Sequence, residues 1–272
     1  MKRNIALLPI RKKKVENMKL VDINSDLGES YGAFKVGNDQ EVLKFISSAN
    51  IACGYHAGDH NVMFETVRLA MEYGVQIGAH PGFPDLAGFG RRKMDLLPHE
   101  IYHLVTYQIG ALAAVCKVSG TSIAHVKPHG ALYNMAAKNR FIAGAIAQAV
   151  ADLDSNITLF GLAGSELVKA GEEKGLLVAQ EVFADRTYQS DGTLTPREQE
   201  NALIHVPQVA VNRAIRMIKE RKVTAIDGTE VEIKADTICV HGDGAQALEF
   251  VKELKHALVQ EKISLRKSWH DE

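Results

Sequence analysis

The chain has 272 residues, a formal net charge of -1, 46% hydrophobic residues and 24% charged residues. This composition is ordinary for a globular protein with a sizeable core, and the balanced charge gives no broad footprint for nucleic acid or an anionic membrane. The three cysteines, Cys53, Cys116 and Cys239, lack the paired spacing of a disulfide framework or a zinc knuckle. We therefore expect a cytoplasmic protein that acts on a small molecule.

Residues 1–17 differ in pattern from the rest of the chain. A short apolar run at 5–10 precedes a basic cluster at 11–14, which reverses the order found in a signal peptide. We identify no segment long enough to span a bilayer. Because the regular pattern of elements begins only after Met18, we expect 1–17 to be a disordered extension and 18–272 to form a single domain.

From residue 20 onward, short apolar runs alternate with longer segments of helical period, which predicts β/α units and a parallel sheet. The predicted strands are 20–24, 49–53, 75–79, 123–127, 157–161, 177–182 and 237–241. The predicted helices are 62–73, 98–118, 139–153, 207–220 and 245–260. A further pair of short strands, 223–226 and 231–233, is joined by Asp227 and Gly228, which predicts a hairpin inserted before the last parallel strand.

Polar and turn-forming residues follow almost every predicted strand. In a closed barrel the carboxyl ends of all strands converge on one mouth, whereas an open doubly wound sheet spreads them along a crevice. Only the barrel brings all of these residues within reach of one another. We therefore predict an α/β fold in which about seven parallel strands form a (β/α) barrel.

Two carboxylates and two histidines follow the first two strands. Asp26 and Glu29 could divide into a proton donor and a proton acceptor within one pocket, or either could cap a loop. His56 and His60 are four residues apart, so with Asp26 they could bind a divalent metal ion that activates water. The alternative is that Asp59 caps a helix and His60 lies in its first turn in solvent. We assign no firm metal site from this pattern.

Lys127 ends an apolar strand. Burying a lysine there is costly unless the ammonium faces a pocket or an anion, which predicts a ligand for a phosphate or an oxyanion. His129 could transfer a proton near neutral pH. A buried ion pair for Lys127 and a loop-bracing role for His129 are the structural alternatives.

The remaining candidates at the mouth lie at other strand ends. Arg186 could bind a substrate carboxylate in bidentate fashion, or it could pair with a nearby acid and brace its loop. The other candidates are either functional or hydrogen-bonded at a strand end: His80, Glu181, Asp185, His241 and Asp243.

Several other features bear on the reaction. The chain has no Walker-type GxxxxGK[ST], no GxGxxG after a strand and no GxSxG, so any ATP phosphates are not held by a P-loop of this chain. Cys53 and Cys239 lie within apolar strands, which indicates buried hydrophobic residues and not nucleophiles. The glycine-rich segment 82–92 could fold Phe83 and Phe89 over the mouth as a lid, with Arg91 and Arg92 meeting an anion, or it could be an ordinary surface loop.

Taken together, these runs resemble the LamB/YcsF family, which comprises the A subunits of bacterial 5-oxoprolinases. The matching runs extend in order from Met18 to near the end of the chain: DINSDLGE (22–29), ANIACGYHAGD (49–59), GAHP (78–81), GFGRR (88–92), HVKPHGALYN (125–134), EVFADR (181–186) and CVHGD (239–243). Two features depart from the family pattern. The family commonly has a residue that is not a metal ligand at the position of His60, and residues 1–17 precede the usual start of the family's sequences.

The resemblance implies a distorted parallel (β/α) barrel, similar to that of polysaccharide deacetylases, spanning residues 18–272. It also implies a protein that works in a complex with two others, B and C, to convert 5-oxoproline and ATP into glutamate, ADP and phosphate. ATP would be a co-substrate accompanied by Mg²⁺, and the chain could also form a homo-oligomer. Our own hypothesis for this chain is that Asp26, His56, Lys127 and His129 are catalytic, with Lys127 and Arg186 holding anionic groups and Asp26, His56 and His129 managing protons and water. The predicted substrate ligands are Glu29, His80, Glu181, Asp185, Arg186, His241 and Asp243.

Two other functions remain open at this point. The chain could be a stand-alone metal-dependent deacetylase or amidohydrolase that uses Asp26, His56 and His60 as metal ligands. It could also be a non-catalytic subunit that presents the substrate to its partners.

Overall fold

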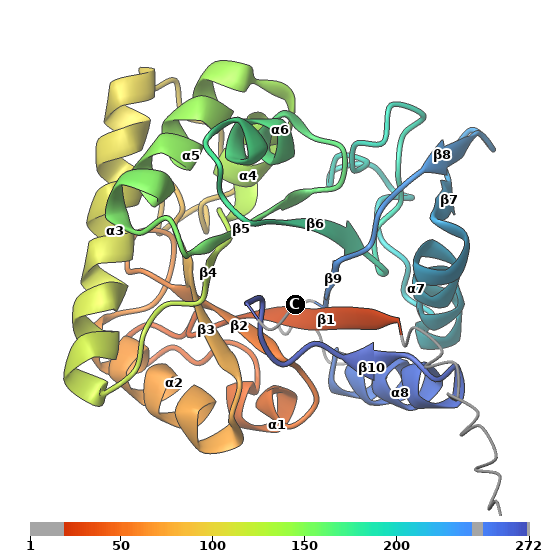
Figure 1. Ribbon diagram of the computed structural model, residues 1–272, viewed down its shortest axis with the longest axis horizontal. Helices are drawn as coiled ribbons and strands as arrows, with labels where there is room; N and C mark the ends of the chain where they lie inside the picture. The colour runs from red at the N-terminus through yellow and green to blue at the C-terminus, as the bar shows by residue number, and fades with distance from the viewer. Residues whose placement is uncertain (1–18, 241–246, 271–272) are drawn as a thin grey trace, which may run out of the picture.

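The computed structural model describes residues 19–240 and 247–270 (Figure 1). The predicted extension at 1–17 lies outside the described residues, as do the candidates His241 and Asp243.

Seven parallel strands form a closed barrel: β1 (Leu20–Leu27), β2 (Ser48–Ala52), β3 (Gln76–His80), β4 (His125–Val126), β5 (Thr158–Leu162), β6 (Val178–Phe183) and β9 (Thr237–Cys239). The strands pair in this order, and the barrel closes because β1 pairs with both β2 and β9. A short strand, β10 (Ser264–Leu265), pairs with the start of β1. The predicted barrel of seven parallel strands is confirmed.

The helices cover the outside of this barrel: α1 (Asp39–Leu43), α2 (His60–Tyr73), α3 (Pro98–Ser119), α4 (Gly130–Lys138), α5 (Arg140–Leu153), α6 (Glu166–Glu173), α7 (Pro207–Glu220) and α8 (Ala247–Gln260). Figure 1 shows α2, α3 and α5 along one side of the barrel and α7 with α8 along the other. The antiparallel strands β7 (Lys222–Thr224) and β8 (Glu230–Glu232) confirm the predicted hairpin. Short helices α1, α4 and α6 were not predicted.

The longest helix, α3, has clear start and stop signals. Pro98 occupies its first turn, and the Glu100 carboxylate accepts a hydrogen bond from the Leu97 backbone N–H at 2.7 Å. Gly120 ends the helix in a left-handed conformation with φ of 80°. By length and composition α3 could cross a membrane, so the expectation that no segment is long enough was wrong on that measure. In the structure its apolar side packs against α2, α5 and β3.

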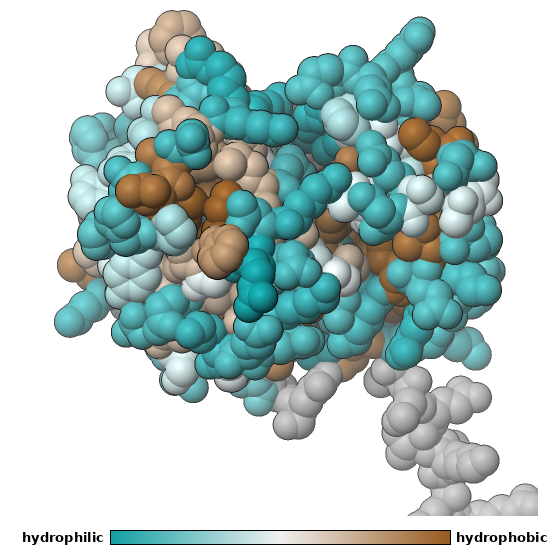
Figure 2. All heavy atoms as spheres, turned by 90° about the horizontal axis from the view of Figure 1, so that it is seen from above, coloured by the Kyte–Doolittle hydropathy of each residue, from teal (hydrophilic) through white to brown (hydrophobic). Residues whose placement is uncertain are grey.

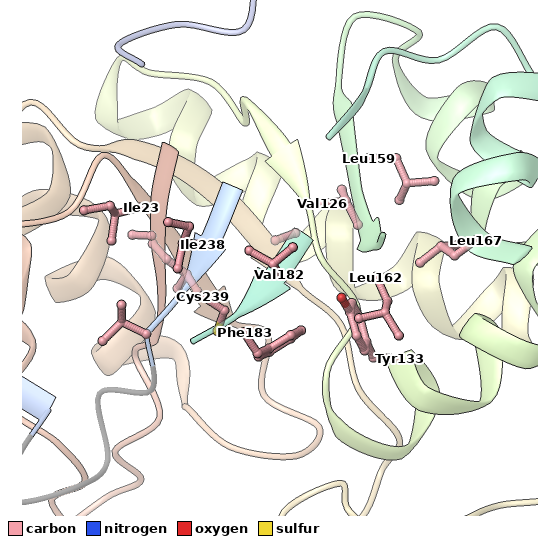
Figure 3. Close-up of a cluster of buried hydrophobic side chains, with 14 of the residues drawn as sticks. Ile23, Val126, Tyr133, Leu159, Leu162, Leu167, Val182, Phe183, Ile238 and Cys239 are labelled. Carbon is pink, nitrogen blue, oxygen red and sulfur yellow. The ribbon is translucent and has the colours of Figure 1, made fainter. Parts of the chain in front are cut away.

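The interior of the barrel is polar and its outer face is apolar. Asp22 and Asn24 of β1 both contact the Thr237 hydroxyl of β9, and Asn24 also donates to Glu181 of β6 at 2.9 Å, so these side chains point inward. The residues that alternate with them face the helices, because successive side chains of a strand point to opposite faces. Figure 3 shows this outer layer around Ile23, Val182 and Ile238, which come from three neighbouring strands.

Aromatic rings fill the barrel toward the amino-terminal ends of the strands. The His125 ring of β4 stacks on Phe160 of β5 with centroids 4.2 Å apart, and Trp269 contacts Phe160 edge-on at 5.1 Å. Phe160, Ala179 and Trp269 form a buried cluster separate from the main core. Among the described residues these rings therefore fill this part of the barrel interior.

The tight packing of this interior predicts the effect of a single added methyl group. A Cβ on Gly78 of β3 would lie 2.1 Å from Nε2 of His125, so Gly78→Ala should lower the free energy of unfolding by about 3 kcal/mol. Gly110→Ala in α3 is the matched control, since its Cβ would meet nothing within 4 Å and should stabilise the helix by roughly 0.5–1 kcal/mol. Urea unfolding measures both; equal stability of the two variants would contradict the inward orientation of His125.

Candidate active site

A cavity of about 530 Å³ opens at the carboxyl ends of the strands. Six of the residues singled out in the sequence line it together: Asp26, Glu29, His80, Lys127, His129 and Arg186. The face shown in Figure 2 is predominantly hydrophilic, with hydrophobic side chains gathered in smaller patches. The polar strand ends therefore do meet at one mouth, as a barrel requires.

Lys127 lies at the centre of the cavity floor, with only 2% of its surface exposed. Its Nζ lies 3.0 Å from Oδ1 of Asp26 and 2.8 Å from Oε1 of Glu181, and it donates to Oδ1 of Asn24 at 3.1 Å. Burial alone would lower the pKa of Lys127, but the charges of Asp26 and Glu181 outweigh it and hold this pKa well above its usual value. Lys127 is therefore a permanent positive charge that is both paired and in contact with the cavity.

Glu181 occupies a different place from the one predicted. Its side chain is fully buried beneath Lys127, where it accepts hydrogen bonds from the Asn24 amide and from the Tyr133 hydroxyl at 2.6 Å. It does not line the cavity. The contacts of Glu181 are with Lys127, Asn24 and Tyr133, so in this structure it positions Lys127, and a contact with the substrate stays a prediction.

Asp26 links Lys127 to a group of histidines. It lies inside β1 and not after it, because β1 continues to Leu27. Its Oδ1 accepts a hydrogen bond from the Asn50 amide at 2.8 Å, and its Oδ2 lies 3.3 Å from Nε2 of His80. Its side chain is 12% exposed, so a molecule in the cavity can reach this carboxylate.

Next to Asp26, three imidazoles and one carboxylate lie close together. His80 Nε2 is 2.9 Å from Nδ1 of His129, and His56 stacks on His129 with centroids 3.7 Å apart and planes within 4°. Oε1 of Glu29 lies 3.5 Å from Nε2 of His56 and 3.8 Å from Nδ1 of His129. Burial, reinforced by the neighbouring imidazoles, lowers the pKa of His56 and of His129 well below the usual histidine value. Both rings are therefore neutral near pH 7.

The metal-ligand set considered from the sequence is not assembled. Asp59 caps α2, accepting hydrogen bonds from the backbone N–H groups of Asn61 and Val62, and His60 is exposed in the first turn. The four-residue spacing of His56 and His60 therefore spans a turn and a helix start, so the rings do not share a helical face. A different group can hold a metal: one ligand atom each from Glu29, His56, His80 and His129 lie within 4.8 Å of one another.

The comparisons with known proteins extend over nearly the whole chain. The model of the LamB/YcsF family matches residues 21–271. The chain belongs to the LamB/YcsF family. A relative from Oceanobacillus iheyensis, named as the A subunit of 5-oxoprolinase, is 61% identical over 247 residues, covering 91% of this chain and 96% of the relative.

Solved structures agree with this membership. A lactam utilization protein from Thermus thermophilus is 47% identical, with a TM-score of 0.86, and the match covers 91% of this chain and 99% of that one. A family 4 carbohydrate esterase from Streptomyces lividans is 12% identical, with a TM-score of 0.50, and the match covers 91% of each chain. This second likeness concerns the fold alone and confirms the predicted relation to the polysaccharide deacetylase barrel.

In this LamB/YcsF chain Arg186 braces a loop at the rim of the cavity. The guanidinium is 3% exposed and donates to the backbone carbonyls of Thr195 at 2.5 Å and of Ala202 at 3.3 Å. Burial lowers the pKa of Arg186 to about 10. Asp185 beside it does not line the cavity. Arg186 therefore lines the cavity while its donors hold the loop, and the structure does not bring Asp185 to the substrate side.

Part of the predicted lid faces the cavity. Phe89, in a left-handed conformation with φ of 54°, lines it, and the Arg91 guanidinium lies 4.9 Å from the Phe89 ring centroid. Phe83 is fully buried in the core, so the lid prediction was wrong for Phe83. Arg92 is exposed and pairs with the Asp85 carboxylate.

The cysteines of this LamB/YcsF chain do not offer a nucleophile. Cys53, Cys116 and Cys239 are all free and buried. Burial raises the pKa of Cys53 to about 12 and that of Cys239 well above its usual value, so both stay protonated near pH 7. Their interpretation as buried hydrophobic residues is confirmed.

Sequence reasoning missed three polar residues that organise the site. Asn50 donates to both Asn24 and Asp26, and His125 contacts the Asn50 carbonyl oxygen at 2.7 Å. Tyr133 lies among the buried side chains shown in Figure 3 and donates to Glu181. An asparagine or histidine within an apolar strand was the available signal, because a buried polar side chain needs a partner inside the fold.

Proposed function

We propose that this chain is the A subunit of a 5-oxoprolinase, in which it opens the lactam ring of 5-oxoproline to yield L-glutamate in a reaction coupled to ATP hydrolysis. The observation that carries this proposal is the 61% identity, along nearly the full length of both chains, to a protein named as the A subunit of 5-oxoprolinase. The lactam utilization protein of the same fold points to the same class of substrate.

The charge around the cavity suits a small anionic substrate. Six cationic side chains line it, against three carboxylates (Asp26, Glu29 and Glu198): Arg91, Lys93, Lys127, Lys138, Arg186 and Arg197. 5-Oxoproline carries one carboxylate, and phosphorylation of its lactam oxygen would add further negative charge. Cations at the rim raise the local concentration of such an anion, and the buried ammonium of Lys127 can stabilise negative charge that develops on the lactam oxygen.

The remaining roles follow from the contacts of Asp26 and the histidines. Asp26 can accept a proton from an attacking water, since its carboxylate reaches the cavity and is held in place by Asn50 and Lys127. His129, which is neutral, lines the cavity beside His80 and can position water or the lactam there. His56 supports the His129 ring by stacking. Glu29 and His80 line the same wall of the cavity.

ATP and its Mg²⁺ are assigned to the complex and not to a phosphate-binding loop of this chain. The sequence has no Walker-type motif, so the proposal gives the nucleotide site to one of the two partners, B or C. A cytoplasmic location is part of the same proposal, and the three free cysteines fit a reducing compartment.

The proposal is tested by mixing the purified chain with its two partner subunits and measuring glutamate release from 5-oxoproline. We expect release with ATP and none without it. ATP-independent release by the chain alone would favour a stand-alone amidohydrolase. An equal rate without this chain would show that it is not needed for turnover.

A further inference from the structure

We propose that Glu29, His56, His80 and His129 form a binding site for one divalent transition-metal ion of the zinc class. The ligand atoms would be Oε1 of Glu29, Nε2 of His56, Nε2 of His80 and Nδ1 of His129. These residues follow or end several different strands of the barrel, so the site is built by the fold and not by one local motif. The set shares only His56 with the ligands considered from the sequence.

The hydrogen bonds of two histidines fix which ring nitrogen is free to bind an ion. Nδ1 of His80 lies 2.7 Å from the Lys127 carbonyl oxygen, and Nε2 of His129 lies 2.8 Å from the Phe89 carbonyl oxygen. A carbonyl oxygen only accepts, so both of these nitrogens carry the proton and donate. When each ring carries only this one proton, Nε2 of His80 and Nδ1 of His129 are lone pairs.

These two lone pairs face each other at 2.9 Å. Two acceptors at that separation repel unless a positive charge lies between or beside them. A divalent cation satisfies both lone pairs at once. The two carbonyls also act as the outer partners that commonly orient metal-bound histidines.

His56 gives a second, independent observation. Its side chain is fully buried, and neither of its ring nitrogens has a hydrogen-bond partner among the residues that the structure describes. A buried imidazole normally makes at least one hydrogen bond, because leaving a polar group unpaired costs roughly 1–3 kcal/mol. Nε2 of His56 points toward Glu29 at 3.5 Å, so an ion at this point would supply the missing partner.

The separations suit a small ion. A tetrahedral zinc ion with bonds of about 2.0–2.1 Å places its ligand atoms roughly 3.3–3.5 Å apart. Three of the six pairs here are separated by 2.9 Å (His80 and His129), 3.5 Å (His56 and Glu29) and 3.8 Å (His129 and Glu29), and all four ligand atoms lie within 4.8 Å of one another. Three imidazole nitrogens with one carboxylate oxygen favour zinc, cobalt or nickel over magnesium or calcium, which prefer oxygen ligands.

Binding requires one ring to turn. His56 and His129 are nearly parallel, and a lone pair lies in the plane of its ring, so one ion cannot lie in both planes. His129 is held by its hydrogen bond to Phe89, whereas His56 has no hydrogen bond of its own in the described chain and can rotate. Two glycines lie next to the His56 side chain. A Cβ on Gly82 would lie 2.7 Å from Nδ1 of His56, and a Cβ on Gly90 would lie 2.7 Å from Cβ of His56, so larger residues at these two positions would crowd it.

The experiment measures metal binding directly and needs no turnover. The purified full-length chain is stripped with a chelator and titrated with Co²⁺, whose visible absorption reports coordination by nitrogen and oxygen ligands. We expect one equivalent to bind with a tetrahedral or five-coordinate spectrum, and Zn²⁺ to displace it. No Co²⁺ absorption beyond that of the free ion, with no bound Zn²⁺ detected by mass spectrometry, would overturn the proposal.

Three variants locate the site. His56→Ala and Glu29→Gln should each weaken Co²⁺ binding by more than about 100-fold, which exceeds the loss typical of an outer-shell change. His60→Ala is the matched control, since His60 is exposed and lies only four residues away, and its binding should equal that of the wild type. Unchanged binding in His56→Ala, or loss in His60→Ala, would contradict the assignment.

Near-ultraviolet circular dichroism confirms that each variant is folded. Glu29→Gln keeps the size of the side chain, so it tests the site even if His56→Ala unfolds.

Discussion

Replacing Lys127 by methionine is expected to abolish measurable glutamate release and to lower the free energy of unfolding by roughly 3–5 kcal/mol. The variant keeps the length of the side chain but removes the charge that lies 3.0 Å from Asp26 and 2.8 Å from Glu181. Two carboxylates would then share a buried site without a cation, and one of them would have to take up a proton. Activity is lost because the same ammonium is the cation at the cavity floor.

Two further variants separate these effects. Adding Glu181→Gln to Lys127→Met should restore part of the stability, because it removes the fully buried carboxylate, but it should restore no activity. Lys169→Met is the surface control, since Lys169 pairs with Glu166 in solvent and its loss should cost no more than about 1 kcal/mol. Urea unfolding and glutamate release measure both properties. A Lys127→Met chain as stable as the Lys169→Met chain would contradict the buried network.

Asp26→Asn is expected to lower kcat of the reconstituted complex by about 10²–10⁴-fold, the range for loss of a general base. Asparagine keeps the size of the side chain, and Lys127 keeps its pairing with Glu181, so the fold should survive. The expected loss is therefore catalytic and not structural. Steady-state glutamate release at saturating 5-oxoproline measures kcat, and thermal unfolding measures the fold.

Asp152→Asn is the control for this change. Asp152 also accepts hydrogen bonds from neutral side chains, Tyr102 and Gln148, but lies exposed on α5, away from the cavity lining. Its replacement should leave kcat unchanged. A folded Asp26→Asn chain with wild-type kcat would show that Asp26 is not the proton acceptor, and would favour the alternative of a chain that only presents the substrate.

The barrel was predictable because polar residues follow its strands, a feature that hydrophobic periodicity alone does not include. Polar residues followed nearly every apolar run, and only a closed sheet brings them together. The helices that were missed, α1, α4 and α6, are short. α1 has only five residues, and α4 begins at Gly130 within a run that reads as a turn between Lys127 and the next helix.

The site was predictable as a set of residues but not as an arrangement. Asp26, Lys127 and His129 were expected at the mouth and lie there, whereas Glu181 is one layer deeper, beneath Lys127. That depth depends on the register between β6 and β9, which places Glu181 beside Thr237, and register is set by pairing that no local pattern reveals. The spacing of His56 and His60 does not place both rings on one helical face, because the helix begins only at His60, which is the alternative that an Asp59 cap predicted.

The most direct test of the central claim is to titrate this chain into a fixed amount of its two partner subunits with ATP and 5-oxoproline. The account predicts no glutamate without the chain, a rate that rises to a plateau at equimolar chain, and a rate about 10²–10⁴-fold lower when the Asp26→Asn chain replaces it. The folded Asp26→Asn chain should also inhibit, because it competes with the wild type for the partners. Full glutamate release by the partners alone would contradict the claim that ring opening takes place at the mouth of this barrel.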